Sequence, residues 1–200
     1  MIIVGAGPSG LLLALLLSKH GIGVQILEAA AQLDQQPRAA HYGSPAIPEF
    51  ERAGIADAIR AQGMVLDTLC WRRPDDHTLM AGFDAGRVLR DVGGVDLRTH
   101  CLALQELDAL MLGEVVGKYG GTVEWEHKVV NVGQDETGAW CEVEVPGRER
   151  KVVKGDYVVG CDGANSIVRR SLFGDEFPGH TWDAQIIATN VSCCADNGKG

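Results

Sequence analysis

Apolar residues along this chain occur in short runs that are typical of buried strands and in longer stretches with helical spacing. The first run, over residues 2–4, is β-branched and stops at a glycine, and a leucine-rich stretch over 11–17 follows it. A second short run over 24–27 ends in an acid, Glu28. This order of strand, glycine turn, helix and strand predicts a parallel βαβ unit at the N-terminus.

The middle of the chain changes its hydrophobic period twice. Polar residues with prolines predict a loop, apolar residues three and four positions apart predict two short helices, and alternation then predicts two strands. These elements are expected, in chain order, over residues 29–43, 44–53, 55–61, 64–73 and 78–84. A longer helical pattern over 101–119 follows, and Gly120 and Gly121 are expected to stop it.

The second half of the chain predicts mainly strands. Turn residues at 134–138 and 146–147 separate runs that we interpret as an antiparallel meander over 122–125, 128–134, 139–145 and 151–153. A further buried strand over 157–159 runs into a glycine-containing turn. A helix is expected to begin near Ala164.

Composition and charge restrict the function more than the fold. The chain is 46% hydrophobic, as globular proteins are, and its net charge of −9 argues against binding to nucleic acid or anionic membranes. No basic segment precedes the N-terminal apolar run, which is too short to span a bilayer, so we expect a cytoplasmic protein without membrane attachment. The six cysteines show neither a CxxC pair nor zinc-ligand spacing, so no metal site is predicted.

The first turn carries the strongest chemical signal. Gly5, Gly7 and Gly10 have GxGxxG spacing, in which the first glycine permits the turn, the second admits a pyrophosphate and the third permits close packing. The helix that follows offers free N–H groups to phosphates, and Glu28 is placed to accept hydrogen bonds from a ribose diol. The pattern predicts a dinucleotide site but leaves FAD and NAD open. The alternative is a βαβ unit without a ligand.

Two further features have more than one interpretation from the residues alone. Arg38 is the only Lys or Arg of the predicted loop, and it could reach a phosphate or a flavin or be a solvated surface charge. Asp162 and Gly163 follow the strand over 157–159, where the carboxylate could bond a sugar hydroxyl. Asp-Gly after a strand is also a common turn signal.

Together, GAGPSG near the N-terminus, Glu28, Arg38 and CDGANSIVRRSL resemble class A flavoprotein monooxygenases, the family of p-hydroxybenzoate and phenol hydroxylases. The resemblance implies an α/β fold with a Rossmann-like FAD-binding domain of the glutathione-reductase type, an antiparallel meander and the beginning of a mixed-sheet substrate domain. It divides the chain into a discontinuous FAD-binding domain and partial substrate-domain strands, over residues 1–63 with 101–178 and 64–100 with 179–200, respectively.

The resemblance also implies which residues hold FAD. The implied cofactor-binding residues are Gly5, Gly7, Pro8, Ser9, Gly10, Glu28, Arg38, Gln105, Val130, Asp162 and Gly163. In this interpretation the glycine turn holds the pyrophosphate, Glu28 binds the adenosine ribose and Arg38 lies beside the flavin. Gln105 matches a position that contacts the cofactor, and the strand at Val130 lies against the adenine.

The implied reaction is hydroxylation of a small aromatic or phenolic substrate. NAD(P)H reduces the flavin, O₂ adds to it, and the flavin hydroperoxide transfers a hydroxyl group, which requires no metal. No residue is assigned to proton transfer. Histidines are candidates by chemistry alone, namely His41, His100, His127 and His180. The residues do not distinguish NADH from NADPH.

Other functional classes are also considered. Members of the resembled family are about twice as long, and their second half carries a further FAD-binding Gly-Asp motif to which nothing in this sequence corresponds. The chain is therefore interpreted as a truncated monooxygenase or as a noncatalytic nucleotide-binding remnant or interaction protein. An NAD-dependent dehydrogenase is less favoured because the predicted meander interrupts the βαβ repeat. An unfinished substrate sheet would expose strand edges, which predicts self-association.

Overall fold

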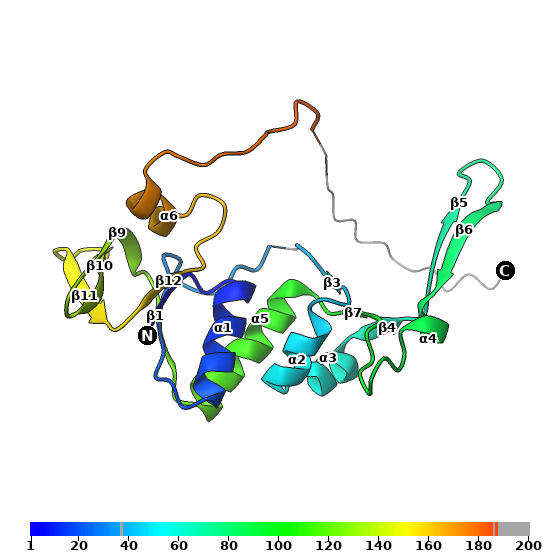
Figure 1. The fold of residues 1–200 in the computed structure, drawn as a ribbon, viewed down its shortest axis with the longest axis horizontal. Helices are drawn as coiled ribbons and strands as arrows, with labels where there is room; N and C mark the ends of the chain where they lie inside the picture. The colour runs from blue at the N-terminus through cyan, green and yellow to red at the C-terminus, as the bar shows by residue number, and fades with distance from the viewer. Residues whose placement is uncertain (37, 186, 188–200) are drawn as a thin grey trace.

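The computed structural model describes residues 1–36, 38–185 and 187, and its centre is a parallel sheet (Figure 1). Four strands form this sheet in the order β12-β1-β2-β8. Their bounds are β1 (Ile2–Val4), β2 (Gln25–Leu27), β8 (Thr122–Glu124) and β12 (Val158–Gly160). In register, Ile3 lies beside Ile26 on one side and Val159 on the other. The predicted N-terminal βαβ unit is confirmed, with α1 (Pro8–Lys19) between β1 and β2.

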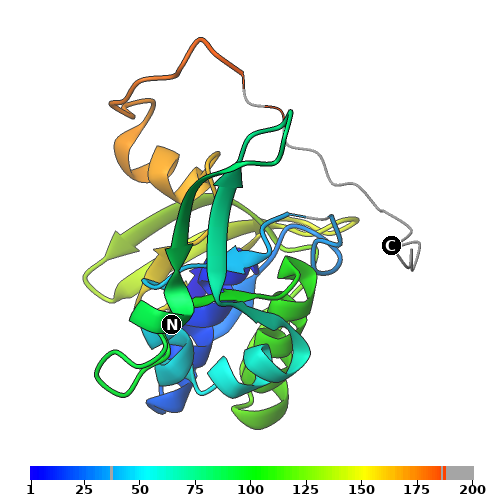
Figure 2. The same cartoon turned by 90° about the vertical axis from the view of Figure 1, so that its right-hand side faces the viewer.

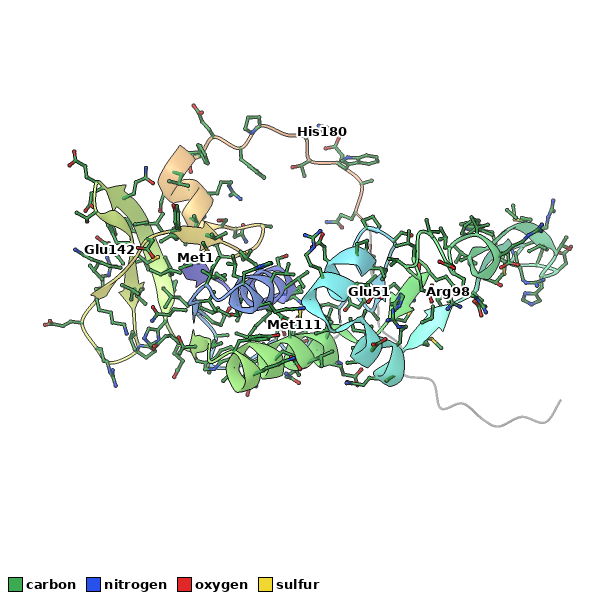
Figure 3. The ribbon with its side chains drawn as sticks, turned by 60° about the horizontal axis from the view of Figure 1, so that its bottom comes forward. Met1, Glu51, Arg98, Met111, Glu142 and His180 are labelled. Carbon is green, nitrogen blue, oxygen red and sulfur yellow. The ribbon has the colours of Figure 1, made fainter. Side chains whose placement is uncertain are left out.

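The parallel sheet has a different hydrophobic core on each face. Ile3 and Ile26 belong to the cluster that includes Leu11 and Leu15 of α1 and Met111 of α5 (Leu104–Gly113). Met111 is labelled in Figure 3, on the helix that runs along α1. Because successive side chains of a strand point to opposite faces, the neighbours of Ile3 face the other way. They pack in a second cluster formed by Ile2, Val4, Leu27, Val129, Cys141, Val143 and Val168.

The meander that covers this second face is smaller than the sequence predicts. It consists of β9 (Lys128–Asp135), β10 (Gly138–Glu144) and β11 (Lys151–Gly155), in the order β11-β10-β9. The first predicted meander strand instead joins the parallel sheet as β8, beside β2. Glu126 has a φ of 56°, a left-handed conformation that redirects the chain between the two sheets. The prediction that the strand over 122–125 belongs to the meander is therefore wrong.

The helical region differs from the prediction at the two ends of the helix expected over 101–119. The short helices α2 (Ile47–Ala53) and α3 (Ala56–Gln62) are confirmed, and α5 begins at Leu104 rather than at Cys101. The preceding residues form β7 (Thr99–Cys101), which pairs with two further strands, β3 (His41–Tyr42) and β4 (Met64–Leu66). Tertiary pairing therefore overrides the helical pattern at its start. At its end, α5 continues as the π-helix η1 (Glu114–Lys118).

A hairpin projects from the helical end of the molecule in Figure 1, and it stands in front of the other elements in Figure 2. The predicted strand over 64–73 is divided at Asp67 into β4 and β5 (Thr68–Arg72), and β5 pairs with β6 (Leu79–Asp84). The short helix α4 (Ala85–Val88), which was not predicted, follows the hairpin. Apolar hairpin side chains are exposed, among them Leu69, Trp71, Leu79, Met80 and Phe83.

A short helix follows the last strand of the parallel sheet. The helix α6 (Ile167–Phe173) packs against β9 and is the last element in the described part of the chain. In the stretch 179–200, where substrate-domain strands are predicted, residues 179–185 and 187 contain no strand. The rest of that stretch lies outside the described residues.

Candidate functional site

A cavity of about 860 Å³ opens where β1, β2 and β12 end and α1 begins. The location is where dinucleotides bind in doubly wound sheets, beyond the carboxyl ends of the strands. The residues predicted from the sequence that line it are Gly5, Gly7, Pro8, Ser9, Glu28, Arg38, Val130, Asp162 and Gly163. Gly10 and Gln105 do not line this cavity.

The glycine turn is shaped by close backbone approach. Gly5 has a φ of +103°, and a Cβ atom at this position would lie 2.5 Å from the carbonyl oxygen of Cys161. Gly7 is the N-cap of α1 with extended backbone, and a Cβ there would have no neighbour within 4 Å. The first turn of α1 carries no acidic side chain. The positive end of the helix dipole therefore faces the cavity without a carboxylate from the helix itself, which favours an anion.

Glu28 is fixed at the tip of β2 by the backbone. Its Oε2 accepts a hydrogen bond from the N–H of Ala6 at 2.7 Å, and its Oε1 accepts one from the N–H of Ala30 at 2.8 Å. A carboxylate offers about four acceptor sites, so these two bonds orient the group and leave acceptor capacity toward the cavity. Ribose binding by Glu28 stays a prediction.

Asp162 has an intramolecular function that the sequence did not indicate. Its Oδ2 accepts hydrogen bonds from the N–H groups of Ile167 at 2.6 Å and Val168 at 3.3 Å, and its Oδ1 accepts one from the Ser166 hydroxyl at 2.5 Å. The carboxylate therefore caps α6 together with Ser166, the N-cap residue, whose hydroxyl accepts a hydrogen bond from the N–H of Arg169 at 3.0 Å. These bonds explain why the helix begins at Ile167 rather than near Ala164. Its bond to a sugar hydroxyl stays a prediction.

Removing this cap is expected to loosen α6. We expect Asp162→Ala to lower the free energy of unfolding by about 1–2 kcal/mol, because two amides at the start of the helix lose their acceptor. Urea unfolding measures the loss, and hydrogen exchange should locate it at the amides of Ile167 and Val168. Asp162→Asn, which keeps one acceptor oxygen, is the control and should retain part of the stability. Unchanged amide protection in Asp162→Ala would contradict the capping function.

A smaller cavity of about 160 Å³ adjoins the main one. Gly7, Pro8, Glu28 and Arg38 line both. Arg38 forms an ion pair with Asp34 at 2.7 Å, and both side chains are largely exposed, at 62% and 47%. Exposed pairs of this kind contribute little stability, so Arg38 is held weakly at the boundary between the cavities.

Asp108 of α5 also lines the smaller cavity and is 3% exposed. Its Oδ1 is buried and has no hydrogen-bond partner among the described residues. Burial, with a smaller contribution from the Asp34 charge, raises the pKa of Asp108 to about 6. Gln105, one turn earlier, also has a buried oxygen without a partner, but Leu104 rather than Gln105 reaches the cavity.

This raised pKa predicts how stability depends on pH. The folded chain retains the Asp108 proton up to a pH of about 6, whereas an unfolded aspartate loses it near 3.8, so stability falls as pH rises between these values. We expect Asp108→Asn to match the wild type near pH 4 and to be more stable by about 2–3 kcal/mol at pH 8. Urea unfolding across this range tests the difference, with the exposed Asp57→Asn as control. Parallel pH profiles for wild type and Asp108→Asn would contradict it.

Several cavity residues were not predicted. Lys128 and Arg170 bring positive charge to the lining. The Arg170 side chain donates a hydrogen bond at 2.8 Å to the backbone carbonyl oxygen of Asn165, which also lines the cavity. Arg170 belongs to the quoted CDGANSIVRRSL segment, so its place in the short helix that follows Asp162 and Gly163 was the available signal. Lys128 carried no motif, because its location depends on β8 joining the parallel sheet.

The histidine candidates are distributed over the molecule. His127 lines the main cavity, and its Nδ1 lies 2.7 Å from the carbonyl oxygen of Trp125. His100 is fully buried in β7, with Nδ1 2.8 Å from the Arg98 carbonyl and Nε2 3.3 Å from Arg60 Nη1. Because an arginine can only donate hydrogen bonds, Nε2 of His100 accepts one from Arg60, and Nδ1–H donates one to the Arg98 carbonyl. His100 therefore has a structural function, in which it connects β7 with α3. Within the described residues, no group of three or more His, Cys, Asp or Glu side chains could hold a metal ion.

Comparison with known proteins decides the family. The family described as "FAD binding domain" matches residues 1–196 of this chain. The chain belongs to this FAD-binding family. The predicted resemblance to flavoprotein monooxygenases is thereby confirmed, since the curated relatives are monooxygenases and hydroxylases of aromatic compounds.

Two of the curated relatives illustrate how much of each protein matches this chain. The 6-hydroxy-3-succinoylpyridine 3-monooxygenase HspB of Pseudomonas putida (strain DSM 28022 / S16) is 34% identical over 193 residues, which are 96% of this chain and 48% of that protein. The para-nitrophenol 4-monooxygenase of Pseudomonas sp. (strain WBC-3) is 30% identical over 96% of this chain and 46% of its own length. This FAD-binding chain thus spans about half the length of the curated relatives it matches.

Solved structures show the same relationship in the fold. The p-nitrophenol 4-monooxygenase PnpA from Pseudomonas putida DLL-E4 superposes with a TM-score of 0.81 at 30% identity, over 90% of this chain and 45% of PnpA. The flavin-dependent monooxygenase PieE, solved with FAD and substrate, superposes with a TM-score of 0.74 at 26% identity, over 86% of this chain and 31% of PieE. The fold is that of FAD-binding aromatic hydroxylases, with mixed α/β content.

The cavity fits the cofactor that the family name implies. An open glycine turn at the N-terminus of α1 suits a pyrophosphate, an oriented carboxylate at the end of β2 suits a ribose, and three cationic side chains, Arg38, Lys128 and Arg170, line the same space. Within the described part of the chain, no helix is long and apolar enough to cross a membrane.

Proposed function

We propose that this chain is the FAD-binding part of an FAD-dependent, NAD(P)H-using monooxygenase that hydroxylates a small aromatic or phenolic molecule with O₂. The observation that carries the proposal is the cavity at the carboxyl ends of β1, β2 and β12, into which nine of the predicted cofactor residues converge. Bound FAD would supply the redox chemistry, and the protein would bind, orient and shield it.

Each part of the cavity has a task in this proposal. The N–H groups at the start of α1 hold the pyrophosphate next to Gly7, and Glu28 orients the adenosine ribose. Val130 lies along the cavity from β9, where it packs against the adenine, and Arg38 supplies positive charge from the loop. Asp162 and Gly163 close the cavity from the turn after β12 and hold the start of α6 in place.

The assignment of domains is also a proposal. In it, residues 1–63 and 101–178 form a FAD-binding domain of the glutathione-reductase type, and 64–100 and 179–200 contribute to a substrate domain. The projecting β5–β6 hairpin supports this division, because it does not belong to the parallel sheet and lies at the end of the molecule opposite the meander (Figure 1).

A FAD titration tests the proposed function. The purified chain should quench flavin fluorescence on binding FAD and should bind FMN, which lacks the adenosine half, more weakly. NADH and NADPH are then added in turn under air, and their oxidation is followed at equal concentrations. Binding without oxidation would favour the noncatalytic nucleotide-binding alternative. Displacement of FAD by NAD would favour a dehydrogenase, and failure of a folded chain to bind FAD would overturn the proposal.

We also propose self-association through the exposed hairpin. Trp71 and Met80 are 55% and 66% exposed, and apolar surface of this kind favours contact between copies. Size-exclusion chromatography with light scattering should show species larger than the 21.4 kDa monomer, and the double variant Trp71→Ser with Met80→Ser should reduce them. A monodisperse monomer of the unaltered chain would contradict this expectation.

A further inference from the structure

The smaller cavity contains an imbalance of charge. Asp108 is buried with an unpartnered Oδ1, whereas the arginine that shares the cavity, Arg38, is paired with Asp34 near the surface. A buried carboxylate without a partner is costly, and an exposed ion pair gains little. The pair that Arg38 forms with Asp34 therefore contributes little stability, and the carboxyl of Asp108, which lines the same cavity, is another partner available to the guanidinium.

Arg38 is also placed at the wall that the two cavities share. It lines the main cavity, which fits FAD, and the smaller one, which holds Asp108. A guanidinium presents five N–H donors in a planar fork, so one edge can bond a carboxylate while another faces a ligand. Arg38 and Asp108 both line the smaller cavity, which has a volume of about 160 Å³.

We propose that Asp108 is a positioning residue for cofactor binding, which holds Arg38 at the shared wall when the FAD cavity is filled. In this state Arg38 exchanges Asp34 for Asp108. The buried carboxylate gains a counter-charge, and the guanidinium gains a fixed orientation toward the ligand. The inference rests on the proposed function, because FAD is the ligand whose binding it describes.

Paired variants of the two carboxylates separate this proposal from its alternatives. We expect Asp108→Asn to weaken FAD binding about tenfold and Asp108→Glu to recover most of the affinity, because only the charged variant can hold the guanidinium. Asp34→Asn is the matched control on the other side of Arg38, and it should bind FAD at least as tightly as the wild type. If Arg38 instead binds FAD while it is paired with Asp34, Asp34→Asn will weaken FAD binding more than Asp108→Asn does, and the proposal is wrong.

Two further readouts exclude a merely structural effect. Without FAD, Asp108→Asn should unfold at a temperature no lower than the wild type, so its stability and its FAD affinity change in different directions. In an Arg38→Ala background, Asp108→Asn should cause no additional loss of FAD affinity. An equal loss in both backgrounds would overturn the proposal while leaving FAD binding intact. Absence of FAD binding by the folded wild type would instead overturn the proposed function, and this inference with it.

Discussion

Replacing Gly10 with alanine is expected to destabilise the chain by about 3 kcal/mol. A Cβ atom at Gly10 would lie 2.1 Å from the carbonyl oxygen of Gly5 and 3.3 Å from the Cβ of Cys161. The first neighbour is backbone, so α1 must move away from β1 to admit the methyl group. Alanine favours helix over glycine by about 1 kcal/mol, but this gain is smaller than the cost of opening the packed sheet.

A second helical glycine provides the control for this result. Gly113 lies at the end of α5, and a Cβ there would meet no atom within 4 Å. Gly113→Ala should therefore keep or raise the free energy of unfolding, by up to about 1 kcal/mol. Urea unfolding of both variants measures the difference. Equal stability of the two variants would show that the contact between α1 and β1 is not close in solution.

Gly7→Ala is expected to weaken FAD binding by more than tenfold while the fold persists. Its Cβ would have no neighbour within 4 Å in the protein, but it would project from the N-cap of α1 into the cavity where the pyrophosphate is proposed to lie. Loss of glycine at an N-cap costs less than about 1 kcal/mol of stability, so the two effects differ clearly in size.

Fluorescence titration of the Gly7→Ala variant with FAD, alongside its thermal unfolding, tests this expectation. Gly23→Ala is the matched control, since its Cβ would also meet nothing within 4 Å and Gly23 does not line the main cavity. If Gly7→Ala and Gly23→Ala bind FAD equally well, the pyrophosphate does not pass the glycine turn.

Local sequence patterns predicted the elements whose partners are close in the chain. The apolar run over 2–4, the glycine spacing and the leucine-rich helix together require little beyond their own residues, and the βαβ unit follows. The hairpins of the meander are similarly local. In contrast, β8 and β7 are short strands, and which sheet each joins depends on residues far away in sequence, so their patterns were assigned to the wrong element.

The site shows the same division between local and distant information. The motifs and the family resemblance indicated nine of the residues that line the cavity, because most of these nine lie where a strand ends and a turn follows. The capping of α6 by Asp162 and the unpartnered carboxyl of Asp108 were not indicated. Both depend on the atoms that surround the side chain, and an aspartate in a sequence carries no signal for its burial or its hydrogen-bond donors.

The pairing of β1 with β12 has a consequence for the synthesis of the protein. Ile2 of β1 lies beside Val158 of β12, which is synthesised 156 residues later. The sheet, and the cavity at the ends of its strands, cannot form completely until β12 has been made. At a translation rate of 5–20 residues per second, the delay is roughly 10–30 s. During this time the apolar edge of β1 lacks its final neighbour. We therefore expect contact order to limit the folding rate, and the nascent chain to require chaperone protection before cofactor can bind.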